Sequence, residues 1–395
     1  MTVAGIIAEY NPFHQGHAWH IAQTRAAGAS HVVVVMSGCT VQRGEFAIAQ
    51  TSVRARVALE QGADLVIMLP TPWSCSRAQS FARAGVHLLH SLGCVDVLSF
   101  GSESADLQLI QRAATLLKRE DVISVMRQAI GEGAAFARAR QGAVAQADPQ
   151  AAALLRSPND TLAIEYLSAI AHLGAPFKPL AIARKGAGHD EIGGKGYRSA
   201  SELRITLRST DFDKIELCEV PGLQYLEKEN ANGRMPVDMQ RLERAWLACL
   251  RTMQPNDFAC LPDISEGMEH LLWRAIRQEN SVYDILKTAT SKRYPTARVR
   301  RVLFHALLGA SAKDFEALPC FINVIGFNNR GRKLLHCAKV NAVLPIITRY
   351  ADMRKLPELT RQQYKLECRA ADLMVLAMPE VQLCGMEEKR QTISI

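Results

Sequence analysis

Short runs of β-branched residues alternate with helix-like segments over the first hundred positions of the chain. Four runs, each too short for a helix and rich in Val, Ile or Leu, predict buried strands at residues 3–9, 31–36, 64–69 and 95–100. The segments between them predict helices at about residues 16–27, 51–61 and 77–92. This alternation implies right-handed crossovers, so we predict an α/β fold with a doubly wound parallel sheet.

The pattern changes after the fourth predicted strand. Residues 105–156 are rich in Ala, Gln and Arg with helical spacing, which indicates a helical insertion. A helix at 160–173, a strand at 177–183, a glycine-rich loop at 185–197 and a helix opened by Ser199 or Ser201 follow. Beyond about residue 215 the segments are mostly helical, at 241–253, 267–278 and 295–308, before a last candidate strand at 321–327. We predict an α/β domain over 1–215 and a mostly helical domain over 216–395.

The charge and cysteine content of the chain limit the kinds of protein that it could be. The chain has 47 Lys and Arg against 39 Asp and Glu, a net charge of +8, which suits a polyanionic partner but also fits dispersed solubilising charge. Its 10 cysteines form no CxxC pair and no short-spaced set with His, so neither a disulfide framework nor a zinc site is indicated. No signal-like segment and no run of about 18 apolar residues is visible, so we expect a cytoplasmic protein without a membrane span.

The stretch most informative about chemistry follows the first predicted strand and reads Glu9-Tyr10-Asn11-Pro12-Phe13-His14-Gln15-Gly16-His17. Ligands of doubly wound sheets bind at the carboxyl ends of strands, and a helix that begins there directs its N–H groups at a phosphate. Two imidazoles in this place can donate hydrogen bonds to α-phosphate oxygens as pyrophosphate leaves. Two histidines three positions apart also occur by chance, but the strand, the glycine and the helix start make this combination more specific.

A second element reads Tyr197-Arg198-Ser199-Ala200-Ser201-Glu202-Leu203-Arg204. This element resembles the ISSTxxR-type loop of HxGH nucleotidyltransferases, and the resemblance implies that a serine hydroxyl and the helix N-terminus face the β- and γ-phosphates of a nucleotide. Serine is also a common N-cap without any ligand. With the histidine motif present, we favour the phosphate role.

These two elements resemble the HxGH nucleotidyltransferase superfamily, and further stretches resemble the tRNA(Met) cytidine acetate ligase family. They occur in family order over about residues 3–335 and include Met36-Ser37-Gly38, Gln42-Arg43-Gly44-Glu45, Phe100-Gly101-Ser102-Glu103, Ser157-Pro158-Asn159-Asp160 and Arg184-Lys185-Gly186. The resemblance implies an ATP-dependent ligase that converts acetate to acetyl-adenylate and then acetylates N4 of the wobble cytidine of elongator tRNA(Met). It also implies ATP with Mg²⁺, acetate and tRNA as partners, and leaves the oligomeric state open.

The resemblance also implies roles for single residues. His14 and His17 would be catalytic, Gly101 and Asn159 would lie against the adenosine, and Arg184 with Lys185 would hold phosphate or the nucleotide. Without the family match, a turn glycine, a capping asparagine and surface cations would explain the last four. No metal ligand is assigned, and the sequence leaves open whether protein side chains or only ATP would bind Mg²⁺. The expected ATP site comprises Ile7, Ala8, Glu9, Tyr10, Asn11, Pro12, Phe13, His14, Gln15, Gly16, His17, His20, Gly101, Asn159, Arg184, Lys185, Ser199, Ser201 and Arg204.

A basic run in the predicted helical domain is a candidate RNA-binding segment. Its cations could contact the RNA backbone and Tyr294 could stack on a base, although such a run is often a solvated helix face. The expected tRNA-binding residues are Lys292, Arg293, Arg298, Arg300 and Arg301.

The chain departs from the family pattern at Cys39, Thr40, Thr51, Ser52 and Met68, which leaves its acyl preference open. Two other functions compete with the ligase. One is a nucleotidyltransferase that acts on a small phosphorylated metabolite, which would not need a basic helical second half. The other is a non-catalytic RNA-binding relative, which intact His14, Gly16, His17, Ser201 and Arg204 make less plausible.

Overall fold

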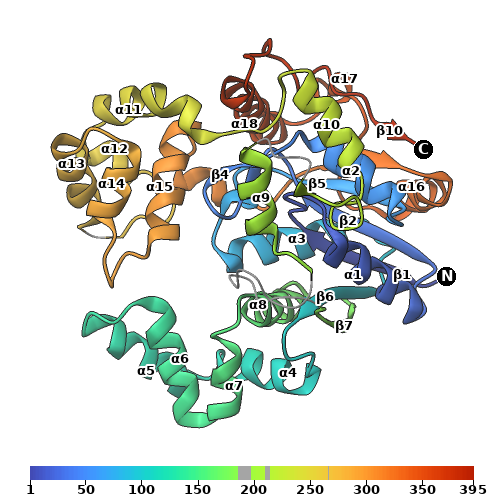
Figure 1. The fold of residues 1–395 in the computed structure, drawn as a ribbon. Coiled ribbons are helices and arrows are strands. Elements are labelled where there is room, and N and C mark those ends of the chain that lie inside the picture. Colours follow the sequence, from blue (N-terminus) through green and yellow to red (C-terminus); the bar gives the residue numbers. More distant parts are fainter. Residues whose placement is uncertain (186–196, 210–213, 266) are drawn as a thin grey trace.

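An eight-stranded sheet forms the centre of the fold in the computed structural model, which describes residues 1–185, 197–209, 214–265 and 267–395 (Figure 1). The strand order is β10-β8-β5-β2-β1-β6-β7, and β9 pairs with β8. The strands are β1 (Val3–Ala8), β2 (His31–Ser37), β5 (Leu65–Leu69), β6 (Val97–Ser102), β7 (Lys178–Ala183), β8 (Ile322–Phe327), β9 (Ile346–Ile347) and β10 (Ile393–Ser394).

The strand pairing confirms most of the predicted sheet and corrects one part. Strands β5, β2, β1, β6 and β7 pair with one another in parallel, as predicted, although β6 begins two residues later than the predicted strand. Strand β8 runs antiparallel to β5, so the sheet is mixed and not wholly parallel. The segments that form β8 and β10 therefore complete the sheet although they come from the region predicted to be mostly helical. The predicted boundary near residue 215 stays a prediction.

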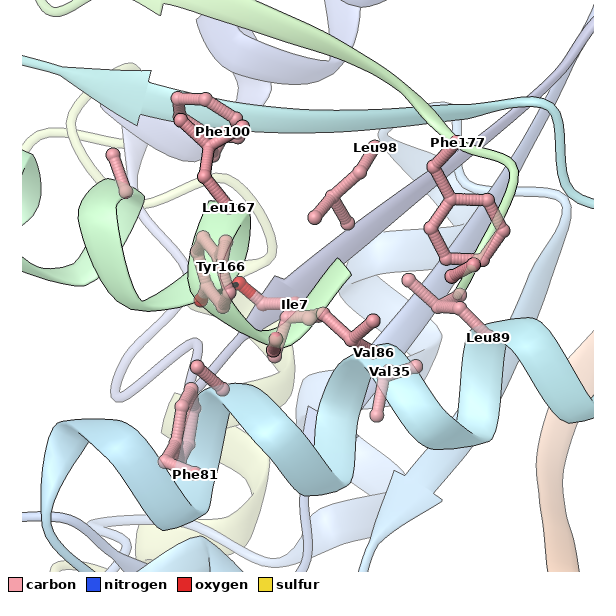
Figure 2. Close-up of a cluster of buried hydrophobic side chains, with 14 of the residues drawn as sticks. Ile7, Val35, Phe81, Val86, Leu89, Leu98, Phe100, Tyr166, Leu167 and Phe177 are labelled. Atoms are coloured by element: carbon pink, nitrogen blue, oxygen red, sulfur yellow. Dashed lines mark hydrogen bonds between the residues drawn. The ribbon is translucent and has the colours of Figure 1, made fainter. Parts of the chain in front are cut away.

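Helices cover both faces of the sheet because its central strands are apolar on both sides. Val33 and Val35 face α3 (Ala78–Ser91), α8 (Pro158–Leu173) and α16 (Asn329–Asn341), within a core that includes Phe81 and Leu89 (Figure 2). Val32 and Val34 face the opposite side, where α1 (Gln15–Ala26) and α2 (Thr51–Glu60) pack. This two-sided burial is the expected property of a doubly wound sheet.

Two groups of helices lie beside the sheet (Figure 1). The predicted insertion is helical, as α4 (Leu107–Leu116), α5 (Glu120–Gly131), α6 (Phe136–Ala147) and α7 (Pro149–Leu154). The second group has its own core and comprises α11 (Glu243–Thr252), α12 (Pro255–Ala259), α13 (Met268–Gln278), α14 (Val282–Ala289), α15 (Thr296–Leu308) and α18 (Glu358–Met374). The remaining elements are β3 (Thr40–Val41), β4 (Glu45–Phe46), α9 (Ala200–Arg208), α10 (Leu223–Ala231) and α17 (Tyr350–Met353). Among the residues described, no helix combines the length and the apolar character needed to cross a bilayer.

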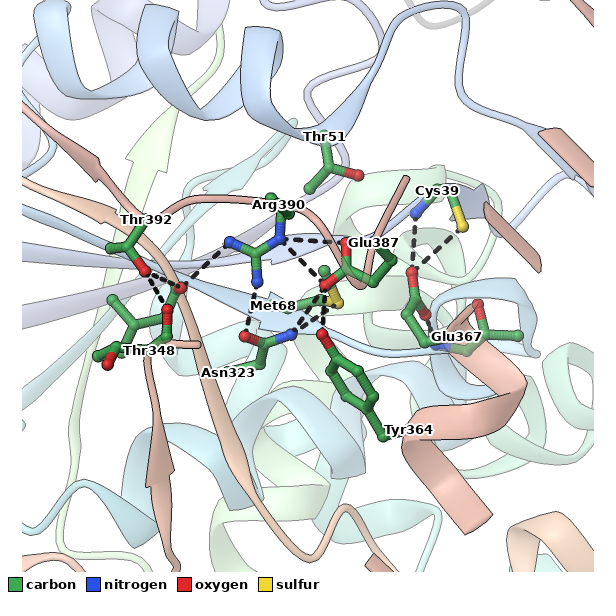
Figure 3. Close-up of polar contacts among 12 residues, drawn as sticks. Cys39, Thr51, Met68, Asn323, Thr348, Tyr364, Glu367, Glu387, Arg390 and Thr392 are labelled. Carbon is green, nitrogen blue, oxygen red and sulfur yellow. Dashed lines mark hydrogen bonds and ion pairs between the residues drawn. The ribbon is translucent and has the colours of Figure 1, made fainter. Parts of the chain in front are cut away.

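A buried polar network joins the C-terminal segment to the loops at the ends of β2 and β5 (Figure 3). The Glu367 carboxylate, 1% exposed, accepts hydrogen bonds from the backbone N–H groups of Cys39 (3.2 Å) and Thr71 (2.6 Å) and from the Cys39 thiol (3.2 Å). Beside it, Glu387 pairs with Arg390 at 3.0 Å. Glu367 therefore fixes two loops of the sheet to α18.

Candidate active site

A cavity opens at the carboxyl ends of β1 and β6, which are neighbours in the sheet. The chain continues from β1 to β2 on one side and from β6 to β7 on the other, so the strand order reverses here. Ligands of doubly wound sheets bind at such a switch point. The described residues that line the cavity are Ile7, Ala8, Glu9, Tyr10, His14, Gly16, His17, Trp19, His20, Gln42, Phe81, Phe100, Gly101, Asn159, Leu162, Tyr166, Ile182, Ala183, Arg184, Lys185, Tyr197, Arg198 and Ser199.

The loop between β1 and α1 is held in one conformation. Tyr10 has a positive φ of 49°, which is uncommon for a residue with a side chain and turns the chain sharply after the strand. Its ring, 1% exposed, packs edge-on against Phe13 and His17, each at 4.7 Å between ring centroids. The Asn11 carboxamide oxygen accepts a hydrogen bond from the backbone of Ile48 at 2.8 Å. These contacts orient the helix start that carries the two histidines.

The same two histidines form the N-terminal cap of α1. The backbone N–H of Gly16 donates to Nδ1 of His14 (3.0 Å), and the backbone N–H of His14 donates to Nδ1 of His17 (3.2 Å). The two rings stack with their centroids 3.8 Å apart. Because each Nδ1 accepts a hydrogen bond, the ring proton of a neutral histidine lies on Nε2. The cap therefore leaves two Nε2–H donors beside a helix N-terminus in the cavity, an arrangement suited to an anion.

The imidazoles of the cavity are neutral at pH 7. Burial, followed by the positive charges of Arg184 and Arg204, lowers the pKa of His14 to about 3. Burial is also the main cause that lowers the pKa of His17 well below 6.5 and that of His20 to about 4. The neutral rings of His14 and His17 can still donate from Nε2, so these two side chains offer a phosphate hydrogen bonds and not a formal positive charge. Nε2 of His20 instead shares a hydrogen bond with the Ser99 hydroxyl at 2.9 Å.

The imidazoles of His14, His17 and His20, which are half-buried, make stability depend on pH. Because the pKa of His20 falls from 6.5 to about 4 on folding, the unfolded chain binds more protons between these values. The neutral imidazoles contribute fully to the free energy of unfolding above pH 6.5, and this contribution is lost as the pH falls towards 4. The loss is at most about 1.4 kcal/mol per pH unit for each imidazole, and solvent screening reduces it. Thermal denaturation between pH 7.5 and about pH 5 should show this decline, and His20→Gln should flatten it. An unchanged slope in His20→Gln would contradict the assignment.

Residues at the other edge of the cavity come from β6, β7 and α8. Gly101 lies beside Arg184, because a Cβ atom added at this glycine would lie 3.5 Å from Cγ of that arginine. The Asn159 amide donates to Glu103 at 2.6 Å, and the Lys185 ammonium lies 4.6 Å from the centre of the Trp19 ring. Ser199 caps α9 by accepting from the backbone of Glu202 at 3.2 Å, so the predicted N-cap is confirmed.

Six residues of the predicted ATP set are not among the described residues that line the cavity, namely Asn11, Pro12, Phe13, Gln15, Ser201 and Arg204. Arg204 instead donates to the backbone oxygen of Asn11 (2.7 Å) and to Ser201 (3.2 Å). Arg43 also donates to Ser201, at 3.1 Å. These residues therefore support the loop that carries the histidines. Most of the predicted glycine-rich loop, residues 186–196, lies outside the described residues.

The prediction missed several residues that line the cavity. Phe81, Phe100 and Tyr166 belong to the hydrophobic core, and the same rings form an apolar wall of the cavity (Figure 2). Their apolar character in helix and strand patterns signals only a core position. Gln42 stands in one of the family-like motifs, and this was the available signal for it.

The basic run of 292–301 divides into two parts. Arg298 donates to the backbone oxygen of Asp263 (2.8 Å), and Arg301 forms an ion pair with the Asp263 carboxylate (3.1 Å). Lys292 and Arg293 are exposed, and Arg300 is half-buried. Tyr294 is 6% exposed and packs in the helical core, so the expectation that it stacks on a base is wrong in this conformation.

None of the five residues that depart from the family pattern is among the described residues that line the cavity. Cys39 contacts Glu367, and Thr40 shares hydrogen bonds with Thr71 (2.9 Å) and Ser74 (2.5 Å). Met68 contacts Asn323, Thr51 lies 3.4 Å from Arg54, and Ser52 lies in a separate surface hollow. The five departures thus lie outside the described wall of the cavity.

Known proteins resemble the chain over nearly its whole length. The family model described as HIGH Nucleotidyl Transferase matches residues 1–389. The tRNA(Met) cytidine acetate ligase of Caldanaerobacter subterraneus subsp. tengcongensis is 35% identical over 95% of this chain and 96% of its own, and that of Thermoanaerobacter sp. (strain X514) is 32% identical over 98% of each. A crystal structure of Thermotoga maritima TmcAL bound with alpha-thio ATP is similar with a TM-score of 0.93 and 28% identity, covering 100% of this chain and 99% of that chain.

Proposed function

The chain belongs to the tRNA(Met) cytidine acetate ligase family, and we propose that it uses ATP and acetate to acetylate N4 of the wobble cytidine of elongator tRNA(Met). The observation that carries this proposal is the pair of stacked, neutral imidazoles at the switch point of the sheet. A related protein with the same fold binds an ATP analogue, which supports ATP as the nucleotide.

In the first step, an acetate oxygen would attack the α-phosphorus of ATP and displace pyrophosphate to form acetyl-adenylate. The Nε2–H groups of His14 and His17 would donate to the α-phosphate oxygens as negative charge develops on them. Arg184 and Lys185, both exposed at the edge of the cavity, would hold the outer phosphates. Neutral donors and cations preorganised in this way stabilise the transition state more than the ground state.

The proposal also includes a metal ion that accompanies ATP and a cellular location. Mg²⁺ would enter with ATP and neutralise phosphate charge, since Mg²⁺ in such sites keeps several waters and takes few protein ligands. A tRNA substrate implies a cytoplasmic site of action.

The tRNA would occupy a cleft between α3, α6 and α15, here called the basic cleft. Two adjoining hollows form it, and both are lined by Arg77, Arg83 and the aromatic ring of Phe136, which is 57% exposed. Among the described residues, no carboxylate forms an ion pair with Arg77 or Arg83. Arg293 and Arg298 of the basic run line the same cleft. Exposed cations with an interleaved aromatic ring suit an RNA strand.

Substitution in the basic cleft should weaken RNA binding. We expect Arg77→Ala and Arg83→Ala each to lower tRNA affinity and to reduce the slope of log affinity against log salt by about 1, because each removes one phosphate contact. Filter binding over a salt series measures both effects, and ATP affinity should not change. Arg298→Ala and Arg301→Ala should have smaller effects on the slope because Asp263 already binds these side chains.

Arg251→Ala, which removes an exposed arginine of α11 outside the cleft, serves as the control. An equal loss of slope in the control would mean that binding follows total charge and not the cleft.

The proposed function is tested by incubating bulk tRNA with the protein, ATP and labelled acetate, followed by mass spectrometry of the nucleosides. Label in N4-acetylcytidine is the expected result. Acetate-dependent exchange between ATP and pyrophosphate without labelled cytidine would limit the function to activation of acetate. Absence of both activities would overturn the proposal.

A further inference from the structure

We propose that the Glu9 carboxylate recognises the N4 amine of the acceptor cytosine and takes its proton when the amine attacks acetyl-adenylate. This inference rests on the proposed function and assigns a residue to its second step. Glu9 was expected only as part of the ATP site.

The position of Glu9 supports this role. It directly follows β1 and is the one carboxylate among the described residues that line the nucleotide cavity. Its Oε1 accepts a hydrogen bond from the backbone N–H of Gln42 at 2.8 Å, and its own backbone oxygen accepts from Arg54 at 2.7 Å. Among the described residues, Gln42 provides the hydrogen bond that this carboxylate receives, so Oε2 remains available to a ligand.

Gln42 and Ser76 link the nucleotide cavity to the basic cleft on the side where Glu9 lies. The Gln42 side chain lines the nucleotide cavity and donates to the backbone oxygen of Ser76 at 3.5 Å. Ser76 lines the basic cleft. A base that enters the cavity from an RNA strand in the cleft therefore passes Gln42 and meets Glu9.

A carboxylate matches the chemistry of this acceptor. The exocyclic N4 amine of cytosine is a hydrogen-bond donor, and Glu or Asp is the side chain that accepts from it, whereas the O4 atom of uracil would face the carboxylate with another acceptor. In the transfer step a bond forms between N4 and the acetyl carbon, and the bond between that carbon and the phosphate oxygen of AMP breaks. The amine loses one proton, which passes to Glu9, and AMP leaves with the electron pair of the broken bond.

The surroundings of Glu9 favour its action as a base. Burial raises the pKa of its carboxyl above 4.5, while the hydrogen bond from Gln42 and the charges of Arg204 and Arg43 oppose this increase. A raised pKa makes the carboxylate a stronger base than an exposed glutamate. The titratable or charged groups that act on Glu9, or on which it acts, are Arg43 and Glu45 at the β3–β4 hairpin, Arg54 on α2, Cys75 before α3, Tyr166 on α8 and Arg204 on α9.

The test separates the two half-reactions in Glu9→Gln, which keeps the shape and an oxygen to accept from Gln42. Acetate-dependent exchange between ATP and pyrophosphate reports the first step, and single-turnover transfer of labelled acetyl to tRNA reports the second. We expect the ratio of transfer to exchange to fall by about 10²–10⁴-fold, the usual contribution of a general base. In the wild type the transfer rate should rise with pH through an ionisation that exchange lacks, and Glu9→Gln should lose this rise.

Glu358→Gln, an exposed glutamate of α18, is the matched control and should leave the ratio unchanged. An equal loss of exchange and transfer in Glu9→Gln would overturn the inference and assign Glu9 to adenylation or to folding, and unchanged transfer would also overturn it. If the wild type catalyses exchange but Glu9→Gln transfers normally, the proposed function stands without this role. If the wild type catalyses neither step, the proposed function fails and the inference fails with it.

Discussion

Replacing His14 or His17 with alanine is expected to lower acetate-dependent exchange between ATP and pyrophosphate by about 10²–10³-fold for each residue, the usual cost of removing one preorganised donor. In the proposed mechanism, each substitution removes one Nε2–H donor that would bind the α-phosphate as negative charge develops on it. The two effects should not add fully, because the rings are stacked at 3.8 Å and support each other.

His14 needs a control because its ring also caps α1. Asparagine is a favoured N-cap residue, so His14→Asn should retain more stability than His14→Ala and still lose the exchange reaction. His270→Ala, which removes an exposed histidine from α13, should leave exchange unchanged. Exchange at the wild-type rate in both His14→Asn and His17→Ala would show that the imidazoles take no part in the reaction.

Glu367→Ala is expected to lower the free energy of unfolding by about 2–5 kcal/mol, because it leaves the buried N–H groups of Cys39 and Thr71 without an acceptor, each at a cost of about 1–3 kcal/mol. Urea denaturation measures this loss. Glu367→Gln should be intermediate, since its carboxamide oxygen can still accept while its NH₂ group faces a backbone donor.

Glu358→Ala on the exposed face of the same helix should change the free energy by no more than about 0.5 kcal/mol. A similarly small effect of Glu367→Ala would mean that the two loops are not held by this carboxylate.

The central strands and the histidine motif could be predicted because their signals are local. The apolar runs of β1, β2 and β5 are short and buried on both faces, and the motif directly follows β1. The antiparallel pairing of β8 with β5 could not be predicted in this way. Asn323 and Met68 touch across these strands although they are 255 positions apart, and no periodicity within either segment encodes the direction of pairing.

The side chains around the cavity could likewise not be recognised from local sequence patterns alone. Phe81 and Tyr166 fit the helical core pattern, and their place in the cavity wall depends on how α3 and α8 pack over β1. Arg298 and Arg301 were predicted to bind tRNA from their place in the basic run, which carries no information about their contacts with Asp263. Glu9 lies inside the predicted motif, and only the structure, through its hydrogen bond to Gln42 and the contact of Gln42 with Ser76 of the basic cleft, distinguishes it from the residues predicted to bind phosphate.

Strand β8, which pairs with β5, is synthesised long after it, and this delay has a consequence for biosynthesis. Ribosomes extend a chain by about 5–20 residues per second, so a separation of 255 positions corresponds to roughly 10–50 s. During this time the nascent nucleotide-binding half exposes the apolar strand Leu65–Leu69 as an open sheet edge, which can template pairing with another chain. The emerging polypeptide is therefore open to pairing with other chains along this edge until β8 leaves the exit tunnel.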